Sequence, residues 1–124
     1  MKENSTIGKF VWQDLTIPDA VSLSEFYQKV VGWRTTPHNM GEYNDFEILD
    51  SDDNVVAGIC HKRGSNASIP SQWLLYVTVE NVEASAAECI SLGGKILDGP
   101  RLMGKQQFCV IEDPAGAVLA LIEN

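Results

Sequence analysis

The stretch WQDLTIPDA at residues 12–20 sets a pattern that returns at residues 73–81 as WLLYVTVEN. Each copy begins at a tryptophan, continues as a strand, and ends near Asp19 or Asn81, residue types that favour the first position of a helix. The two copies lie about 61 residues apart, and self-similarity at a fixed spacing is the signature of one structural unit used repeatedly. The chain is therefore predicted to contain two equivalent modules.

The segments that follow each copy are also similar. Apolar residues recur at helical spacing in residues 20–31 and 82–92, and Gly32 and the glycine pair at 93–94 are placed to end these helices. Strand patterns follow at 33–35, 43–49 and 55–61 in the first half, and at 95–97, 107–111 and 117–122 in the second. Each half is thus predicted to be a βαβββ module, with the polar residues 62–72 as the linker.

The order of several short motifs resembles a known superfamily. In the first half they are Asp19 with residues 26–27 and 32–33, and in the second they are residues 79–82, 93–94 and 113–116. Together they resemble the vicinal-oxygen-chelate superfamily of glyoxalase I, bleomycin-resistance proteins and extradiol dioxygenases, over about residues 10–122. Residues 57–61, Trp73 and residues 99–101 resemble its glyoxalase-like subgroup.

That resemblance implies an α+β fold in which two βαβββ modules form a curled mixed sheet around a cleft that holds the ligand. We expect a single glyoxalase-like domain over residues 1–124, with module one at about 7–62 and module two at about 73–124. A homodimer is also expected, because this fold usually exposes a sheet edge and helix faces. Whether the modules pair within one chain or across two chains stays open.

The metal ligands of the superfamily are missing at their expected places. Metal-using members hold a divalent ion in the cleft with side chains from the first and last strand of each module. Carried over by register, these positions fall at Trp12, near Gly58, at Leu74 (or Trp73 with a one-residue slip) and at Ala120. None of these can bind a hard divalent ion, which needs imidazole or carboxylate ligands. We expect no metal and no cofactor.

Strand alternation extends the expected cleft face to further residues. It adds Asp14 beside Trp12, Cys60 beside Gly58, and Tyr76 beside Leu74, while counting back from Ala120 adds Ile111 and Cys109. We interpret Trp12, Gly58, Cys60, Trp73, Leu74, Tyr76, Cys109 and Ala120 as ligand-binding candidates.

Two residues are candidates for acid–base chemistry. A carboxylate at Asp14 in a partly apolar cleft could bind a cation or act as a general base, and His61, which ends a strand, could face the cleft mouth as an acid or base. Each has a structural alternative: a hydrogen-bonded aspartate at a strand end, and a histidine that alternation turns away from the face of Cys60. For the tryptophans and the thiols, the alternative is core packing.

Composition excludes several classes of protein. With 9 basic and 17 acidic residues the net charge is −8, which argues against nucleic acid as a partner, since its binding needs a basic surface. No apolar run is long enough to cross a membrane, and residues 1–9 show no apolar signal core. Three widely spaced cysteines do not suggest a disulfide framework. The expected location is cytoplasmic.

Four functions remain open at this point. The first is a metal-free protein that binds a small organic molecule, with cations among the candidates. The second is a glyoxalase-type lyase or isomerase that acts on a small metabolite with Asp14 or His61 as acid or base. The third is a metal-dependent glyoxalase or dioxygenase. The fourth is an interaction module whose cleft is filled by its own side chains.

Overall fold

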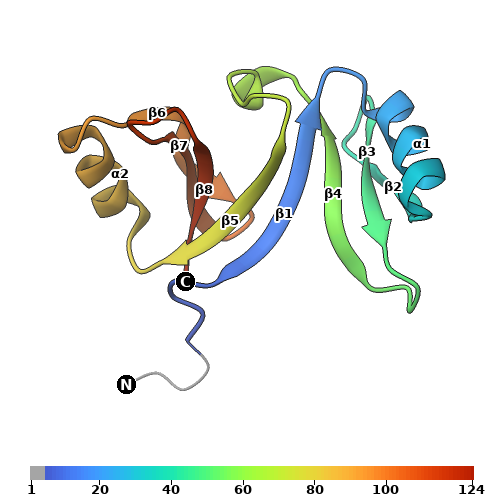
Figure 1. The fold of residues 1–124 in the computed structure, drawn as a ribbon, viewed down its shortest axis with the longest axis horizontal. Helices are drawn as coiled ribbons and strands as arrows, with labels where there is room; N and C mark the ends of the chain where they lie inside the picture. Colours follow the sequence, from blue (N-terminus) through green and yellow to red (C-terminus); the bar gives the residue numbers. More distant parts are fainter. Residues whose placement is uncertain (1–4) are drawn as a thin grey trace. The chain divides into compact units, whose positions relative to one another are not determined.

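The computed structural model describes residues 5–124, which form two compact units. Unit 2 is Gln13–Trp73, and unit 1 comprises the described residues up to Trp12 together with Leu74–Asn124. The chain passes from one unit to the other inside β1 (Phe10–Ile17) and β5 (Trp73–Val79). Each unit is described by itself below (Figure 1).

Unit 2 contains the first predicted module. After β1 come α1 (Ala20–Val31), β2 (Arg34–Asn39), β3 (Asn44–Leu49), β4 (Val55–His61) and a short 3-10 turn, η1 (Gly64–Asn66). The strand order is β2-β3-β4-β1, in which β1 and β4 run parallel and the other pairs antiparallel. The predicted βαβββ pattern is confirmed.

Unit 1 repeats this topology. After β5 come α2 (Val82–Ser91), β6 (Lys95–Met103), β7 (Gln106–Glu112) and β8 (Val118–Glu123), in the order β5-β8-β7-β6. Here too the first and last strands, β5 and β8, pair in parallel. The repeat therefore holds at the level of topology and strand direction, and the α+β fold is confirmed.

The predicted helix ends are confirmed. The carboxylate of Asp19 accepts a hydrogen bond from the backbone N–H of Ser22 at 3.1 Å, and the side chain of Asn81 accepts one from that of Ala84 at 3.0 Å. Gly32 ends α1 with φ at +82°, a conformation that side chains rarely adopt. Hydrogen bonds from the hydroxyl and the N–H of Ser22 hold the pKa of Asp19 below its usual value.

Two strands are longer than predicted. β2 runs past the predicted end at residue 35 and includes Pro37 and His38, because an edge strand can leave one side unpaired and so tolerates proline. β6 continues past Leu97 to Met103, with irregular pairing to β7 on both sides of Asp98. These irregularities change which residues of β6 share a face.

Each unit covers one face of its strands with its own helix. In unit 2, α1 packs on a core of Leu15, Ile17, Ile48, Ala57 and Ile59. In unit 1, Val82 and Ala86 of α2 pack on Cys109 and Leu121. The alternate residues of the same strands face the other way, so the site must be sought on the face opposite the helix. No helix in the described part of the chain is long and apolar enough to cross a bilayer.

Candidate functional site

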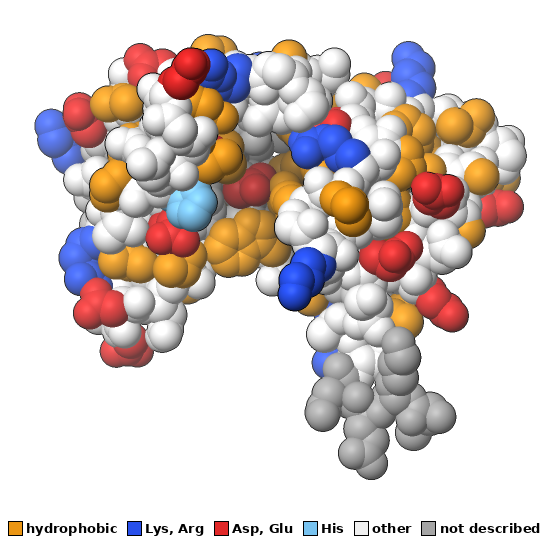
Figure 2. Space-filling model, turned by 180° about the vertical axis from the view of Figure 1, so that it is seen from behind, with side chains coloured by type: hydrophobic (Ala, Val, Ile, Leu, Met, Phe, Trp, Pro, Cys, Tyr) orange, Lys and Arg blue, Asp and Glu red, His pale blue; other side chains and the backbone are white. Residues whose placement is uncertain are grey.

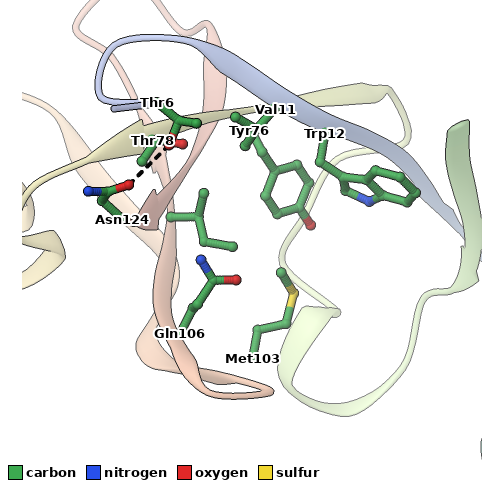
Figure 3. A pocket seen from close by; sticks show the side chains of 9 residues that line it. Thr6, Val11, Trp12, Tyr76, Thr78, Met103, Gln106 and Asn124 are labelled. Atoms are coloured by element: carbon green, nitrogen blue, oxygen red, sulfur yellow. Dashed lines mark hydrogen bonds between the residues drawn. The ribbon is translucent and has the colours of Figure 1, made fainter. Parts of the chain in front are cut away.

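A pocket of about 460 Å³ lies on the face of unit 1 opposite α2 (Figure 3). Its floor comes from Tyr76 and Thr78 of β5 and from Ile122 of β8. Ile122 pairs with Thr78, so the two side chains share the face of the sheet that points away from α2. The lining is Thr6, Val11, Trp12, Tyr76, Thr78, Met103, Gln106, Ile122 and Asn124. The volume falls within the range of roughly 300–1,000 Å³ typical of small-molecule sites.

The lining is aromatic and apolar, with a few neutral polar groups. Figure 3 shows the hydroxyl of Tyr76 pointing toward the space between Trp12 and Met103. Thr6 donates a hydrogen bond to the side chain of Asn124 at 3.1 Å, and the Gln106 amide donates one to the carbonyl of Glu123 at 2.9 Å. None of the described lining residues is charged. Such a pocket suits a ligand with an apolar, uncharged body and one or two polar groups.

Of the predicted residues, Trp12 and Tyr76 come together in this pocket. Leu74 and Ala120 are fully buried and do not line it. Ala120 pairs with Tyr76, so it supports the pocket floor from the neighbouring strand. Alternation therefore placed Tyr76 on the face that lines the pocket, while Leu74 and Ala120 belong to the packing beneath it.

Trp73 was a ligand-binding candidate with core packing as its alternative, and the structure places it in the core. Its indole N–H donates a hydrogen bond to the hydroxyl of Tyr27 at 3.2 Å, and its ring lies edge-on to Tyr27 and Trp33 at centroid distances of 5.3 and 5.7 Å. Trp73 thus packs against the α1 core of unit 2. Alternation explains this placement, because Trp73 and Leu74 point to opposite faces and only Leu74 shares the face of Tyr76.

Cys109 was expected on the cleft face, and this too was wrong. It pairs with Leu121, is fully buried, and packs under α2, together with Ile111. The residue opposite Ala120 is Val110, so the count back through the turn was one residue out of phase. Burial raises the pKa of the Cys109 thiol to about 11, so this thiol is not a nucleophile at neutral pH.

Asp14, Gly58 and Cys60 lie together in unit 2, on the face opposite α1. Asp14 pairs with Gly58, and a Cβ added at Gly58 would lie 3.5 Å from that of Asp14 and 4.0 Å from the Cys60 sulfur. Asp14 is 8% exposed. Burial raises the pKa of the Cys60 thiol, and the charges of Asp14 and Asp45 raise it further. The cluster therefore holds a protonated thiol beside two buried carboxylates.

His61 does not join that cluster. Its backbone N–H donates to the carboxylate of Asp45 at 2.9 Å, while its ring Nδ1 lies 3.4 Å from the carbonyl of Pro18. The imidazole and the Tyr43 ring form a T-shaped pair with centroids 5.4 Å apart. His61 pairs with Ile17, whose side chain belongs to the α1 core. The structure therefore separates the two predicted acid–base residues, Asp14 and His61, onto different faces of the same strands.

The residues at the superfamily's ligand positions do not fit a divalent ion. Trp12, Gly58, Leu74 and Ala120 offer no imidazole or carboxylate. Across residues 5–124, no three His, Cys, Asp or Glu side chains lie close enough to hold a metal together. No chemical step can therefore be assigned to a metal at these positions.

Several lining residues carry no signal in the sequence. Thr78 and Ile122 follow from alternation once the strand pairing is known, but Met103 and Gln106 lie beside the β6–β7 turn, beyond the strand end predicted at residue 97. Asn124 and Thr6 approach the pocket from segments far apart in the chain. Only a three-dimensional structure brings these residues together.

The raised thiol pKa values lead to a test of the packing. At pH 8, we expect iodoacetamide to alkylate Cys109 roughly a hundredfold more slowly in the folded protein than in urea. A thiol whose pKa is raised from 9.0 to about 11 keeps only about a hundredth of the reactive thiolate at this pH. Cys60 should be protected in the same way, and the partly buried Cys89 should react first.

Peptide mass mapping measures the three rates separately. Because the folded pKa of Cys109 is raised, its contribution to stability is complete below about pH 9 and is lost as the pH rises toward 11. Equal alkylation of Cys109 in the folded and unfolded protein would show that it is not packed under α2.

Comparison with known proteins identifies the family. The family model for the glyoxalase-like domain matches residues 11–122. Among curated relatives, "Putative glyoxylase CFP32" of Mycobacterium tuberculosis is 24% identical over 117 residues, covering 94% of this chain and 44% of that protein. The "Anthracycline biosynthesis protein DnrV" of Streptomyces peucetius is 24% identical over 127 residues, covering 92% and 46%. The chain spans less than half the length of these relatives.

Solved structures agree with the fold. A methylmalonyl-CoA epimerase in complex with methylmalonyl-CoA and NH4+ has a TM-score of 0.55 at 15% identity, covering 95% of both chains. Methylmalonyl-CoA epimerase from Mycobacterium tuberculosis has a TM-score of 0.52 at 17% identity, covering 99% of this chain and 92% of that one. At this identity the likeness establishes the fold alone. With the family match extending over nearly its whole length, the chain belongs to the glyoxalase-like domain family.

Proposed function

We propose that this chain binds a small organic molecule with an apolar body in the pocket of unit 1, without a metal ion. The observation that carries the proposal is the lining itself, where Trp12, Tyr76 and Met103 surround a volume of about 460 Å³ and no described lining residue is charged. Aromatic and thioether side chains bind flat, apolar ligands well, and the Tyr76 hydroxyl and Gln106 amide can orient them.

Two further observations support the proposal. The four superfamily ligand positions lack metal-binding side chains, so a ligand here would be held by shape and hydrogen bonds. The relatives named above are linked to small organic molecules by their names, and the epimerase was solved with a CoA ester. The expectation of a cationic ligand gains no support from the pocket, since its described lining contains no carboxylate.

Catalysis is the second candidate function. It is favoured by Asp14, a carboxylate with 8% exposure on the face of unit 2 opposite α1, where it could serve as a general base for a lyase or isomerase. His61 is less suited to share this role, because its ring lies against Pro18 and Tyr43. Consumption of a bound compound that stops in the Asp14→Asn variant would establish this activity.

The binding proposal is tested by a thermal-shift screen of neutral bicyclic aromatic compounds against the purified protein. A compound that binds the folded state raises the melting temperature by mass action. We expect Trp12→Ala to weaken the affinity for such a compound roughly tenfold, because stacking and apolar contact are both lost. Isothermal titration calorimetry measures the change.

A matched control lies on the same strand. Phe10 is 63% exposed and does not line the pocket, so Phe10→Ala should leave the affinity unchanged. Binding that is insensitive to Trp12→Ala would place the ligand elsewhere. A library without any compound that stabilises the protein would favour an interaction module instead.

The remaining expectations stay predictions. A homodimer is consistent with the exposed apolar residues Phe26 and Val30 on α1, and sedimentation equilibrium would measure it.

Figure 2 shows Lys and Arg side chains scattered singly or in small groups over the visible face, among acidic and hydrophobic ones. This distribution supports the view that nucleic acid is not the partner. The cytoplasmic location is likewise a prediction.

A further inference from the structure

Arg101 of β6 is held in place by a buried carboxylate. Its Nε donates to Oδ1 of Asp98 and its Nη2 donates to Oδ2, both at 2.8 Å, in the bidentate geometry that Arg and carboxylates prefer. The Asp98 side chain is 3% exposed and that of Arg101 is 37% exposed. Residues three apart on a regular strand face opposite ways, but the irregular pairing of β6 on both sides of Asp98 turns these two side chains together.

The guanidinium lies on the pocket side of the sheet. Its central carbon sits 4.5 Å from the centroid of the Phe108 ring, and Phe108 stacks on Tyr76 with centroids 6.4 Å apart. Phe108 pairs with both Arg101 and the pocket residue Ile122, and Met103 of the lining follows Arg101 by two residues along β6. The pairing register therefore places Arg101 on the face of the sheet that lines the pocket, two residues before Met103.

The guanidinium is oriented but not saturated. It has five N–H donors, of which Asp98 takes two. Among the described residues, Nη1 makes no hydrogen bond, and Asp98 is the only carboxylate that Arg101 contacts. The hydrogen bonds that Arg101 donates to Asp98 raise the pKa of Arg101 above its usual value, so the group stays charged. An arginine fixed along one edge, with its other edge open beside an apolar pocket, has the geometry that recognises a carboxylate.

From this geometry we infer that the pocket's ligand is an organic acid, whose apolar body lies against Trp12 and Met103 and whose carboxylate binds the open edge of Arg101. This inference rests on the proposed function, because it assigns a chemical class to the ligand of the same pocket. The competing explanation is that Arg101 only neutralises Asp98 and covers Phe108. The two explanations differ in whether the binding of a ligand depends on its negative charge.

The test uses bicyclic aromatic carboxylic acids, each matched to its neutral amide, beginning with 2-naphthoate and 2-naphthamide. At pH 7 the acids should bind roughly tenfold more tightly than their amides, the effect of a charge-assisted hydrogen bond. The double variant Asp98→Asn/Arg101→Gln removes both charges together, so that no buried charge is left without its partner. It should bind acid and amide with equal affinity.

Two further variants complete the experiment. Lys105→Gln removes a positive charge from the exposed β6–β7 turn and should keep the tenfold preference for acids. Arg101→Lys retains a charge beside Asp98 but loses the planar fork, and should weaken acid binding more than amide binding. It serves in place of the double variant if the latter fails to unfold cooperatively on heating.

The outcomes separate the two proposals. If acids and amides bind equally to the wild-type protein, or if the double variant keeps the preference for acids, the inference about Arg101 is overturned while the pocket stands. If no compound of either set binds, the proposed function fails as well.

Discussion

Replacing Phe108 with alanine is expected to lower the free energy of unfolding by roughly 3–5 kcal/mol. Phe108 lies within β7 and is 2% exposed, so truncation removes a whole ring from a closed environment. The ring also stacks on Tyr76 and carries the guanidinium of Arg101 over its face. The cavity left behind would weaken both contacts, because packed neighbours relax only partly into such a space.

Urea unfolding monitored by circular dichroism measures this loss. The Phe10→Ala variant serves as the control, because Phe10 is 63% exposed and its truncation should change the stability by less than about 0.5 kcal/mol. A loss of less than about 1 kcal/mol for Phe108→Ala would contradict the packing of β7 described above.

The second large effect is expected at Gly99. Its φ is +86°, and a Cβ there would lie 2.7 Å from the carbonyl oxygen of Phe108 and 3.1 Å from the backbone nitrogen of Arg101. Both neighbours are backbone atoms of the β6–β7 pairing, so neither can rotate away as a side chain could. Backbone strain and the close contact together should make Gly99→Ala cost roughly 2–4 kcal/mol of stability.

Gly104 provides the matched comparison in the same hairpin. Its φ is also positive, at +64°, but a Cβ there would meet nothing within 4 Å. Gly104→Ala should therefore cost only the conformational strain, roughly 1–2 kcal/mol. The difference between the two melting curves isolates the contact with Phe108. Equal losses at Gly99 and Gly104 would show that β7 does not approach Gly99 closely.

The topology could be predicted from the sequence because it depends on local chemistry that the chain repeats. Asp19 and Asn81 cap helices by short-range hydrogen bonds, and Gly32 supplies a conformation open to few other residues. With the helices fixed, the three strands after each of them follow from turns and alternation. These signals act over a few residues, so they are visible without knowledge of the partner strands.

The site could be predicted only in part, because alternation relates residues within a strand but not between strands. Trp12 and Tyr76 were found through their own strands, whereas Cys109 was misplaced because its face depends on the pairing of β7 with β8. Arg101 and Asp98 share a face only through the irregular pairing of β6. Such a register is set by long-range packing, and no pattern in residues 95–103 predicts it.

The central claim is that a ligand occupies the pocket lined by Trp12. The chain has three tryptophans, so the indole region of a nitrogen-15 NMR spectrum has a signal for each. Titration with 2-naphthoate should move the signal of Trp12 and leave those of Trp33 and Trp73, which pack together in the α1 core. Movement of the Trp33 or Trp73 signal while that of Trp12 stays in place would contradict the account.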